Sequence, residues 1–149
     1  MQTEVRFMTY GELFNCLPQL RQAVIKLEPC VSDETDFLKY ALLNQAYKET
    51  LQRLGGIRLS DDVSFLNTPH ALLRALDKKE TKQVLVDRGL RVTPMLPSPH
   101  SFDELRELLA GCGRGCFLKP RYGSGAGGIM AVRYQPNRNK WVVYTTLQQ

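Results

Sequence analysis

A glycine-crowded stretch contains the residues of this sequence that are best suited to bind an anion. Residues 123–128 read Gly-Ser-Gly-Ala-Gly-Gly, and Lys119, Pro120 and Arg121 stand shortly before them. Glycine lets the backbone adopt positive φ and brings its N–H groups close to a ligand, because no Cβ intervenes. Successive N–H groups in such a turn form an anion-binding nest, and a neighbouring ammonium group adds a full positive charge. This chemistry suits the phosphates of a nucleotide.

Two common phosphate loops do not fit this stretch. A P-loop places its lysine after the last glycine and leads into a helix, whereas Lys119 precedes the glycines. The glycines also fit the spacing G-x-G-x-x-G of a dinucleotide fold, which requires a following helix and an acidic residue about 20 residues further on. Residues Ile129 to Tyr134 instead have the pattern of a strand, and no Asp or Glu follows Glu107.

Two further alternatives concern the same stretch. A protein-kinase loop also joins two strands, but its lysine lies on the next strand, where this chain has Arg133. A glycine-rich hairpin with no ligand is the other alternative, and the loop by itself leaves it open.

Four short motifs, taken in order, resemble the ATP-grasp superfamily. They are Asn-x-Pro, Asp-Lys, Gly-x-x-x-x-Pro and Lys-Pro-x-x-Gly, found here at Asn67–Pro69, Asp77–Lys78, Gly89–Pro94 and Lys119–Gly123. The resemblance extends over about residues 66–147, and its specificity comes from the order and spacing of the motifs.

The resemblance implies a set of cofactor-binding residues. Lys78 and Lys119 would reach the nucleotide phosphates, and Arg121 would add a further contact. The flap that closes over the nucleotide would consist of Gly123, Ser124, Gly125, Ala126, Gly127 and Gly128. Lys79 and Lys82 lie near Lys78, and a run of helical lysines is often a solvated face. Lys78 is preferred because it directly follows Asp77.

The resemblance also implies ATP and Mg²⁺ as cofactors and a carboxylate as substrate. Such enzymes activate a carboxylate as an acyl-phosphate and pass it to an amine or another nucleophile, by positioning and charge neutralisation. The family's magnesium ligands come from a second lobe, and no acid follows Glu107. We therefore expect the metal ligands outside this chain, and the chain to be an inactive N-terminal portion of a ligase-like enzyme. No catalytic residue and no metal ligand is assigned.

The predicted fold class is α/β (α+β), in two domains. Residues 1–66 are expected to form part of a Rossmann-like pre-grasp domain, as β-α-β-α. Its strands are predicted at Thr3–Met8 and Ala23–Pro29, and its helices at Tyr10–Leu17 and Asp33–Leu54. On the second helix, Leu38, Leu42 and Leu51 fall near helical spacing. Asp61–Leu66 is interpreted as the connection to the next domain.

Residues 67–149 are expected to form the N-terminal lobe of the nucleotide-binding domain. Helices are predicted over residues 69–76, 77–88 and 102–110, the last with a capping box formed by Ser101 and Glu104. Strands are predicted at residues 116–118, 129–134 and 141–147, with a hairpin turn at residues 136–139.

Composition places the chain among ordinary globular proteins. It has 149 residues, 43% of them hydrophobic, and no apolar run approaches the roughly 18 residues of a membrane span. Because no signal-peptide pattern opens the sequence, we expect a cytoplasmic location and no membrane partner. Cys16, Cys30, Cys112 and Cys116 have no zinc-site spacing and are interpreted as free thiols.

Two functions of other classes remain open. One is a non-catalytic module that binds a nucleotide or docks a partner protein, with Trp141–Leu147 as the candidate exposed strand edge. A truncated lobe is expected to self-associate, whereas such a module is expected to be monodisperse. The other is RNA binding, because residues 76–149 contain 12 Lys/Arg and 6 Asp/Glu, a balance of 12 − 6 = +6. The lack of an arginine run or of regularly interleaved aromatic residues disfavours nucleic acid as a partner.

Overall fold

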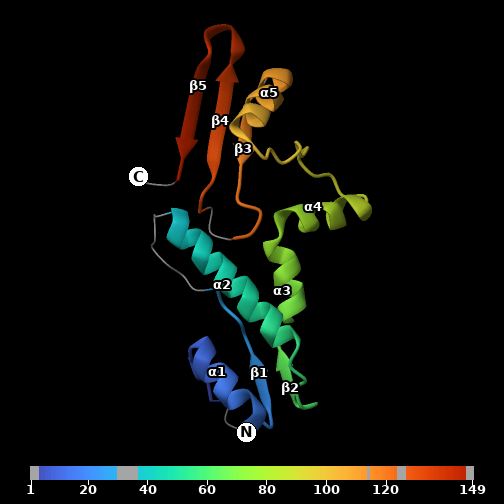
Figure 1. Ribbon diagram of the computed structural model, residues 1–149. Coiled ribbons are helices and arrows are strands. Elements are labelled where there is room, and N and C mark those ends of the chain that lie inside the picture. Colours follow the sequence, from blue (N-terminus) through green and yellow to red (C-terminus); the bar gives the residue numbers. More distant parts are fainter. Residues whose placement is uncertain (1–3, 30–36, 114, 124–126, 147–149) are drawn as a thin grey trace. The chain divides into compact units, whose positions relative to one another are not determined.

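The computed structural model describes residues 4–29, 37–113, 115–123 and 127–146. These residues form a mixed helix and strand structure with a parallel two-stranded sheet and an antiparallel three-stranded sheet (Figure 1). The predicted mixture of helices and strands is thereby confirmed. The chain divides into two compact units, which are described separately: Met1–Cys30 with Ala46–Leu73, and Val31–Gln45 with Arg74–Gln149. The predicted domain boundary at residue 66 stays a prediction.

Unit 1 contains a β-α-β arrangement preceded by a short helix. Its elements, in chain order, are α1 (Tyr10–Cys16), a 3-10 turn (Leu17–Gln19), β1 (Ala23–Ile25), the C-terminal half of α2 (Phe37–Gly55), β2 (Val63–Phe65) and the start of α3 (Pro69–Leu76). Strands β1 and β2 are parallel, with Ala23 opposite Val63 and Ile25 opposite Phe65.

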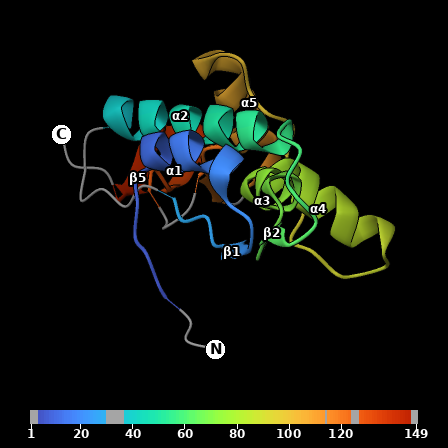
Figure 2. The same ribbon diagram turned by 90° about the horizontal axis from the view of Figure 1, so that it is seen from below.

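The core of unit 1 lies where α1 packs beside the C-terminal half of α2 (Figure 2). The rings of Tyr10 and Tyr47 have centroids 6.0 Å apart, and Leu13, Leu51 and Leu54 are buried. The helical stripe predicted on α2 is therefore buried only toward its C-terminal end.

Two predictions for unit 1 are wrong. Residues 4–8 of the predicted strand Thr3–Met8 are not a strand, and Val5 and Phe7 in this segment are exposed. Alternating polar and apolar residues favour a strand only where a neighbouring strand accepts the backbone hydrogen bonds. The predicted connection Asp61–Leu66 instead contains β2, whose Val63 is buried and pairs with β1.

Unit 2 consists of helices and an antiparallel sheet, as predicted. Its elements after α3 are α4 (Lys78–Asp87), α5 (Phe102–Cys112), β3 (Cys116–Leu118), β4 (Met130–Gln135), a 3-10 turn (Pro136–Arg138) and β5 (Lys140–Thr145). The strands lie in the order β3-β4-β5. The β4–β5 hairpin closes through Asn139, which has a φ of 45°, and asparagine tolerates this left-handed region better than most residues.

The two faces of this sheet differ in what covers them. Helix α5 packs on one face, where the ring of Trp141 lies 4.8 Å from that of Phe102 and 4.6 Å from that of Tyr134. On the other face, Phe117 and Tyr144 both pair with residue 131 of β4 and so share a row. Both side chains remain largely exposed, at 69% and 72%.

None of the helices in the described part of the chain is both long enough and apolar enough to cross a bilayer.

Candidate functional site

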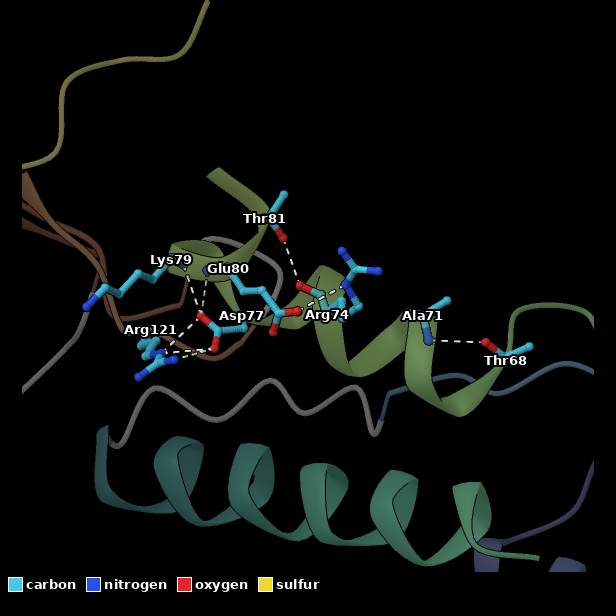
Figure 3. Close-up of polar contacts among 8 residues, drawn as sticks. All are labelled: Thr68, Ala71, Arg74, Asp77, Lys79, Glu80, Thr81 and Arg121. Carbon is cyan, nitrogen blue, oxygen red and sulfur yellow. Dashed lines mark hydrogen bonds and ion pairs between the residues drawn. The ribbon is translucent and has the colours of Figure 1, made fainter. Parts of the chain in front are cut away.

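Asp77 is a buried polar residue of unit 2 with several hydrogen-bond partners. It precedes α4 as its N-cap, and its Oδ1 accepts hydrogen bonds from the backbone N–H groups of Lys79 and Glu80 at 3.0 and 3.2 Å (Figure 3). A short polar side chain at this position satisfies amides that the helix itself leaves unpaired. Asp77 is 4% exposed, so its charge requires further partners.

Arg121 supplies the main partner of that carboxylate. Its Nε donates to both carboxylate oxygens of Asp77 at 3.0 Å, and its Nη2 donates to Oδ2 at 2.7 Å. The Arg121 guanidinium lowers the pKa of Asp77 from 3.8 to about 2; the Glu80 N–H acts in the same direction, and burial opposes both. The backbone N–H of Lys78 also donates to the carbonyl oxygen of Arg121 at 3.0 Å.

Lys78 extends from the first residue of α4 to the glycine-rich loop. Its Nζ donates a hydrogen bond of 2.7 Å to the carbonyl oxygen of Gly123. Burial lowers the pKa of Lys78, and the positive charge of Lys119 lowers it further. The structure thus brings Lys78 to the start of the glycine-rich loop, and Lys119 is near enough for its charge to affect Lys78. Lys119 is exposed, and its Nζ lies 5.7 Å from the centroid of the Phe117 ring.

The ends of the glycine-rich loop lie against Tyr40, in the part of α2 that belongs to unit 2. A Cβ at Gly123 would lie 2.9 Å from the Tyr40 hydroxyl oxygen, and one at Gly127 would lie 2.5 Å from a ring carbon. The φ of Gly123 is 127°. A side chain at either position would clash, so these two glycines permit a close approach of the loop to α2.

Of the other residues of the predicted flap, Gly128 is among the described residues. Gly128 is buried and has a φ of 70°. Ser124, Gly125 and Ala126 lie outside the described residues, so the predicted closure of the flap stays a prediction.

Three other basic residues lie near Lys78 in the sequence or in space: Arg121, Lys79 and Lys82. The Arg121 guanidinium is bound to Asp77, and its predicted contact with phosphate stays a prediction. Lys79 is exposed, and Lys82 donates to the Thr93 hydroxyl at 2.8 Å.

Two pockets lie in the described part of unit 2. The larger, of about 580 Å³, is lined in part by Glu104 and Glu107, and these carboxylates would repel phosphate. The smaller, of about 180 Å³, lies between α2 and residues 120–122 and is lined in part by Tyr40, Asn44 and Arg121. It adjoins the anchored segment before the loop.

The described residues offer no metal site. Among them, no group of three or more His, Cys, Asp or Glu side chains could hold a metal ion. Cys16, Cys112 and Cys116 are free, as predicted, whereas Cys30 lies outside the described residues.

Sequence reasoning did not identify the roles of Tyr40 or of the Asp77–Arg121 pair. The sequence marks Asp77 only as the start of a predicted helix and as the first residue of the Asp-Lys motif. The partners Asp77 and Arg121 are 44 positions apart, and no local pattern marks such a contact.

Comparison of the chain with protein-family models, with curated proteins and with solved structures gave no match.

Proposed function

We propose that unit 2 binds the phosphate groups of ATP, as the N-terminal nucleotide-binding lobe of an ATP-grasp-like carboxylate ligase. The observation that carries the proposal is the placement of Lys78 and Lys119 beside the glycine-rich loop. Two neighbouring ammonium groups repel each other, and burial removes part of the hydration of Lys78. An anion between them would reverse both effects, because it supplies the missing negative charge.

The hydrogen bond between Lys78 and Gly123 suggests how phosphate would enter. A neutral backbone carbonyl now accepts from the ammonium group. A phosphate oxygen is a stronger acceptor, since hydrogen bonds between ionised groups are roughly twice as strong as neutral ones. We therefore propose that phosphate takes the place of the Gly123 carbonyl, and that the loop N–H groups add further donors.

The uncovered face of the sheet provides a place for the base. Lys119 follows Phe117 by two residues, and alternate residues of an extended segment point to the same side. Phe117 and Tyr144 are exposed on that side, and stacking of a base on an aromatic ring contributes about 1–3 kcal/mol. A nucleotide with its phosphates at Lys119 can thus place its base over this row.

The proposal also includes a ligase activity for the intact protein. ATP would activate a carboxylate as an acyl-phosphate, and an amine or another nucleophile would then displace the phosphate. The lysines and loop would orient the phosphates and offset their charge. The carboxylates that would hold Mg²⁺ are expected outside this chain. A cytoplasmic location, where ATP is abundant, is part of the proposal.

Titration of the protein with ATP and with inorganic triphosphate tests the phosphate site. We expect Lys119→Ala to weaken binding about tenfold, because one hydrogen-bonded charge contact contributes roughly 1.5–3 kcal/mol. Lys140→Ala is the matched control, since this exposed lysine lies at the opposite end of the same sheet. Equal effects of the two substitutions, or no binding by the unaltered protein, would reject the proposed site.

A second candidate function is docking of a second copy on the uncovered face. It is favoured by the exposure of Phe117 and Tyr144, which are large aromatic side chains on one face of a sheet. Sedimentation velocity over a range of protein concentrations distinguishes it. Self-association that Tyr144→Ser abolishes, without any effect of ATP, would favour docking over nucleotide binding.

A further inference from the structure

We propose that Asp77 is a positioning residue of the phosphate site, which acts by holding Arg121 and thereby fixing the segment Arg121–Gly123 against the start of α4. The inference rests on the phosphate-binding function proposed above. It assigns a role to a side chain that would not itself touch the ligand.

Both oxygens of the Asp77 carboxylate contact Arg121, and one of them also caps the helix. Oδ1 accepts from the Lys79 and Glu80 amides and from Nε of Arg121. Oδ2 accepts from Nε and Nη2 of Arg121 and has no capping role. A serine or asparagine would suffice for the capping contacts. The second oxygen and the full charge of the carboxylate serve the contact with Arg121.

The held segment includes the backbone group that Lys78 contacts. Asp77 binds the Arg121 side chain, the Lys78 N–H binds the Arg121 carbonyl, and the Lys78 ammonium binds the Gly123 carbonyl. Asp77 and Lys78, at the start of α4, thus hold the segment Arg121–Gly123 through one side chain and two backbone carbonyl groups. Holding binding groups in place before the ligand arrives increases affinity, because less conformational entropy is lost on binding.

A neighbouring ion pair offers a comparison. Glu80, also on α4, pairs with Arg74 at 3.0 Å, but both side chains are nearly half exposed and the contact does not reach the loop. Glu80→Gln therefore removes the same charge from the same helix and leaves the Arg121–Gly123 segment held.

The test compares Asp77→Asn with Glu80→Gln by titration with inorganic triphosphate. Asparagine preserves the N-cap, as it is about as good a cap as aspartate, but its amide group replaces the charged partner of Arg121. We expect Asp77→Asn to weaken triphosphate binding about tenfold and Glu80→Gln to change it less than twofold, with helix content preserved in both. Equal affinities of the two variants, where Lys119→Ala does weaken binding, would overturn the positioning role alone.

Amide hydrogen exchange without ligand supplies a readout that loss of helix structure would not imitate. The Lys78 N–H bonds to the Arg121 carbonyl, whereas the Thr81 N–H bonds to the Asp77 carbonyl inside α4. We expect Asp77→Asn to accelerate exchange at Lys78 about tenfold and to leave Thr81 unchanged. Equal acceleration at both amides would mean that Asp77 only caps the helix. This measurement tests whether Asp77 holds the Arg121–Gly123 segment, independently of the effect of Lys119→Ala on phosphate binding.

Discussion

Asp77 and Lys78 are adjacent residues whose side-chain pKa values are both lowered, with opposite consequences. For Asp77, the hydrogen bonds from Arg121 favour the charged carboxylate, so the shift reflects a stabilising contact. For Lys78, burial and the charge of Lys119 disfavour the ammonium form, so the shift reflects a cost. A phosphate ligand can relieve that cost. For this reason Lys78 and Lys119, among the basic residues of unit 2, form the candidate site.

The titration of Asp77 predicts a pH dependence of stability. Its folded pKa lies below its unfolded value, so the unfolded state binds more protons and stability falls as the pH is lowered. The contribution should be complete above about pH 5 and lost progressively down to about pH 1, with a size of about 1–2 kcal/mol once solvent screening at the exposed Arg121 is allowed for. Urea unfolding of the protein and of Asp77→Asn across this range measures it. A constant difference between the two would contradict the assigned pKa.

Gly127 is predicted to be intolerant of any side chain. Its Cβ would lie 2.5 Å from the Tyr40 ring, so Gly127→Ala must displace the Tyr40 side chain, the loop or α2, and we expect at least tenfold weaker triphosphate binding. Gly111→Ala is the control, because that helical glycine has no atom within 4 Å of a new Cβ and alanine favours a helix. Isothermal titration of both variants measures the difference. Unaltered binding by Gly127→Ala would show that the loop does not need this contact.

At the scale of elements, local signals account for several helix ends in the described part of the chain. Thr9 and Glu12 form a capping box at α1, and the Ser101 hydroxyl accepts from the Glu104 N–H at the start of α5. At the end of α5, Gly113 has a φ of 58°, which suits a helix C-terminus. These signals explain why the predicted helices of unit 2 were found in the structure within a few residues of their predicted ends.

Trp141 links α5 to the sheet, because its ring contacts that of Phe102 on α5 and that of Tyr134 on β4. We expect Trp141→Ala to reduce the free energy of unfolding by about 2–3 kcal/mol, less than a fully buried tryptophan would because its side chain is only partly covered. Tyr144→Ala, on the uncovered face, should change it by less than about 0.5 kcal/mol. Chemical denaturation measures both variants, and similar losses would show that the uncovered face also packs against something.

At the scale of the whole molecule, charge is unevenly distributed along the chain. The net charge is +5, and residues 76–149 account for 12 − 6 = +6 of it. The uneven charge is compatible with binding of ATP and with binding of RNA. The two ligands differ in how many cationic side chains each contacts.

Salt dependence separates the two ligands. If single-stranded RNA binds across the basic half, its affinity should fall as salt is added. In a plot of log K against log salt, the slope should be close to −0.7 per phosphate contact. Lys119→Ala should barely alter the affinity for RNA. ATP should depend strongly on Lys119 and less steeply on salt. Fluorescence titrations with ATP and with an oligonucleotide, at several salt concentrations, measure both. Tighter binding of RNA, insensitive to Lys119→Ala, would replace the nucleotide proposal.

The sequence by itself determined the elements whose signals are local. The helices of unit 2, the three antiparallel strands and their hairpin turn follow from caps, prolines, glycines and apolar spacing within a few residues. Residue type and motif order also singled out Lys78, Lys119 and the glycine-rich loop, because phosphate chemistry needs cations and free amides close together.

Only the tertiary structure decided which of these residues meet. The bonds of Asp77 to Arg121, of Lys78 to Gly123, and the backing of the loop by Tyr40 join segments about 45 residues or more apart. Likewise, Val63–Phe65 is a strand because β1 is available to pair with it, whereas residues 4–8 have no such partner in the described structure. Hydrogen bonding and burial depend on what lies opposite in space, and a local pattern does not contain that information.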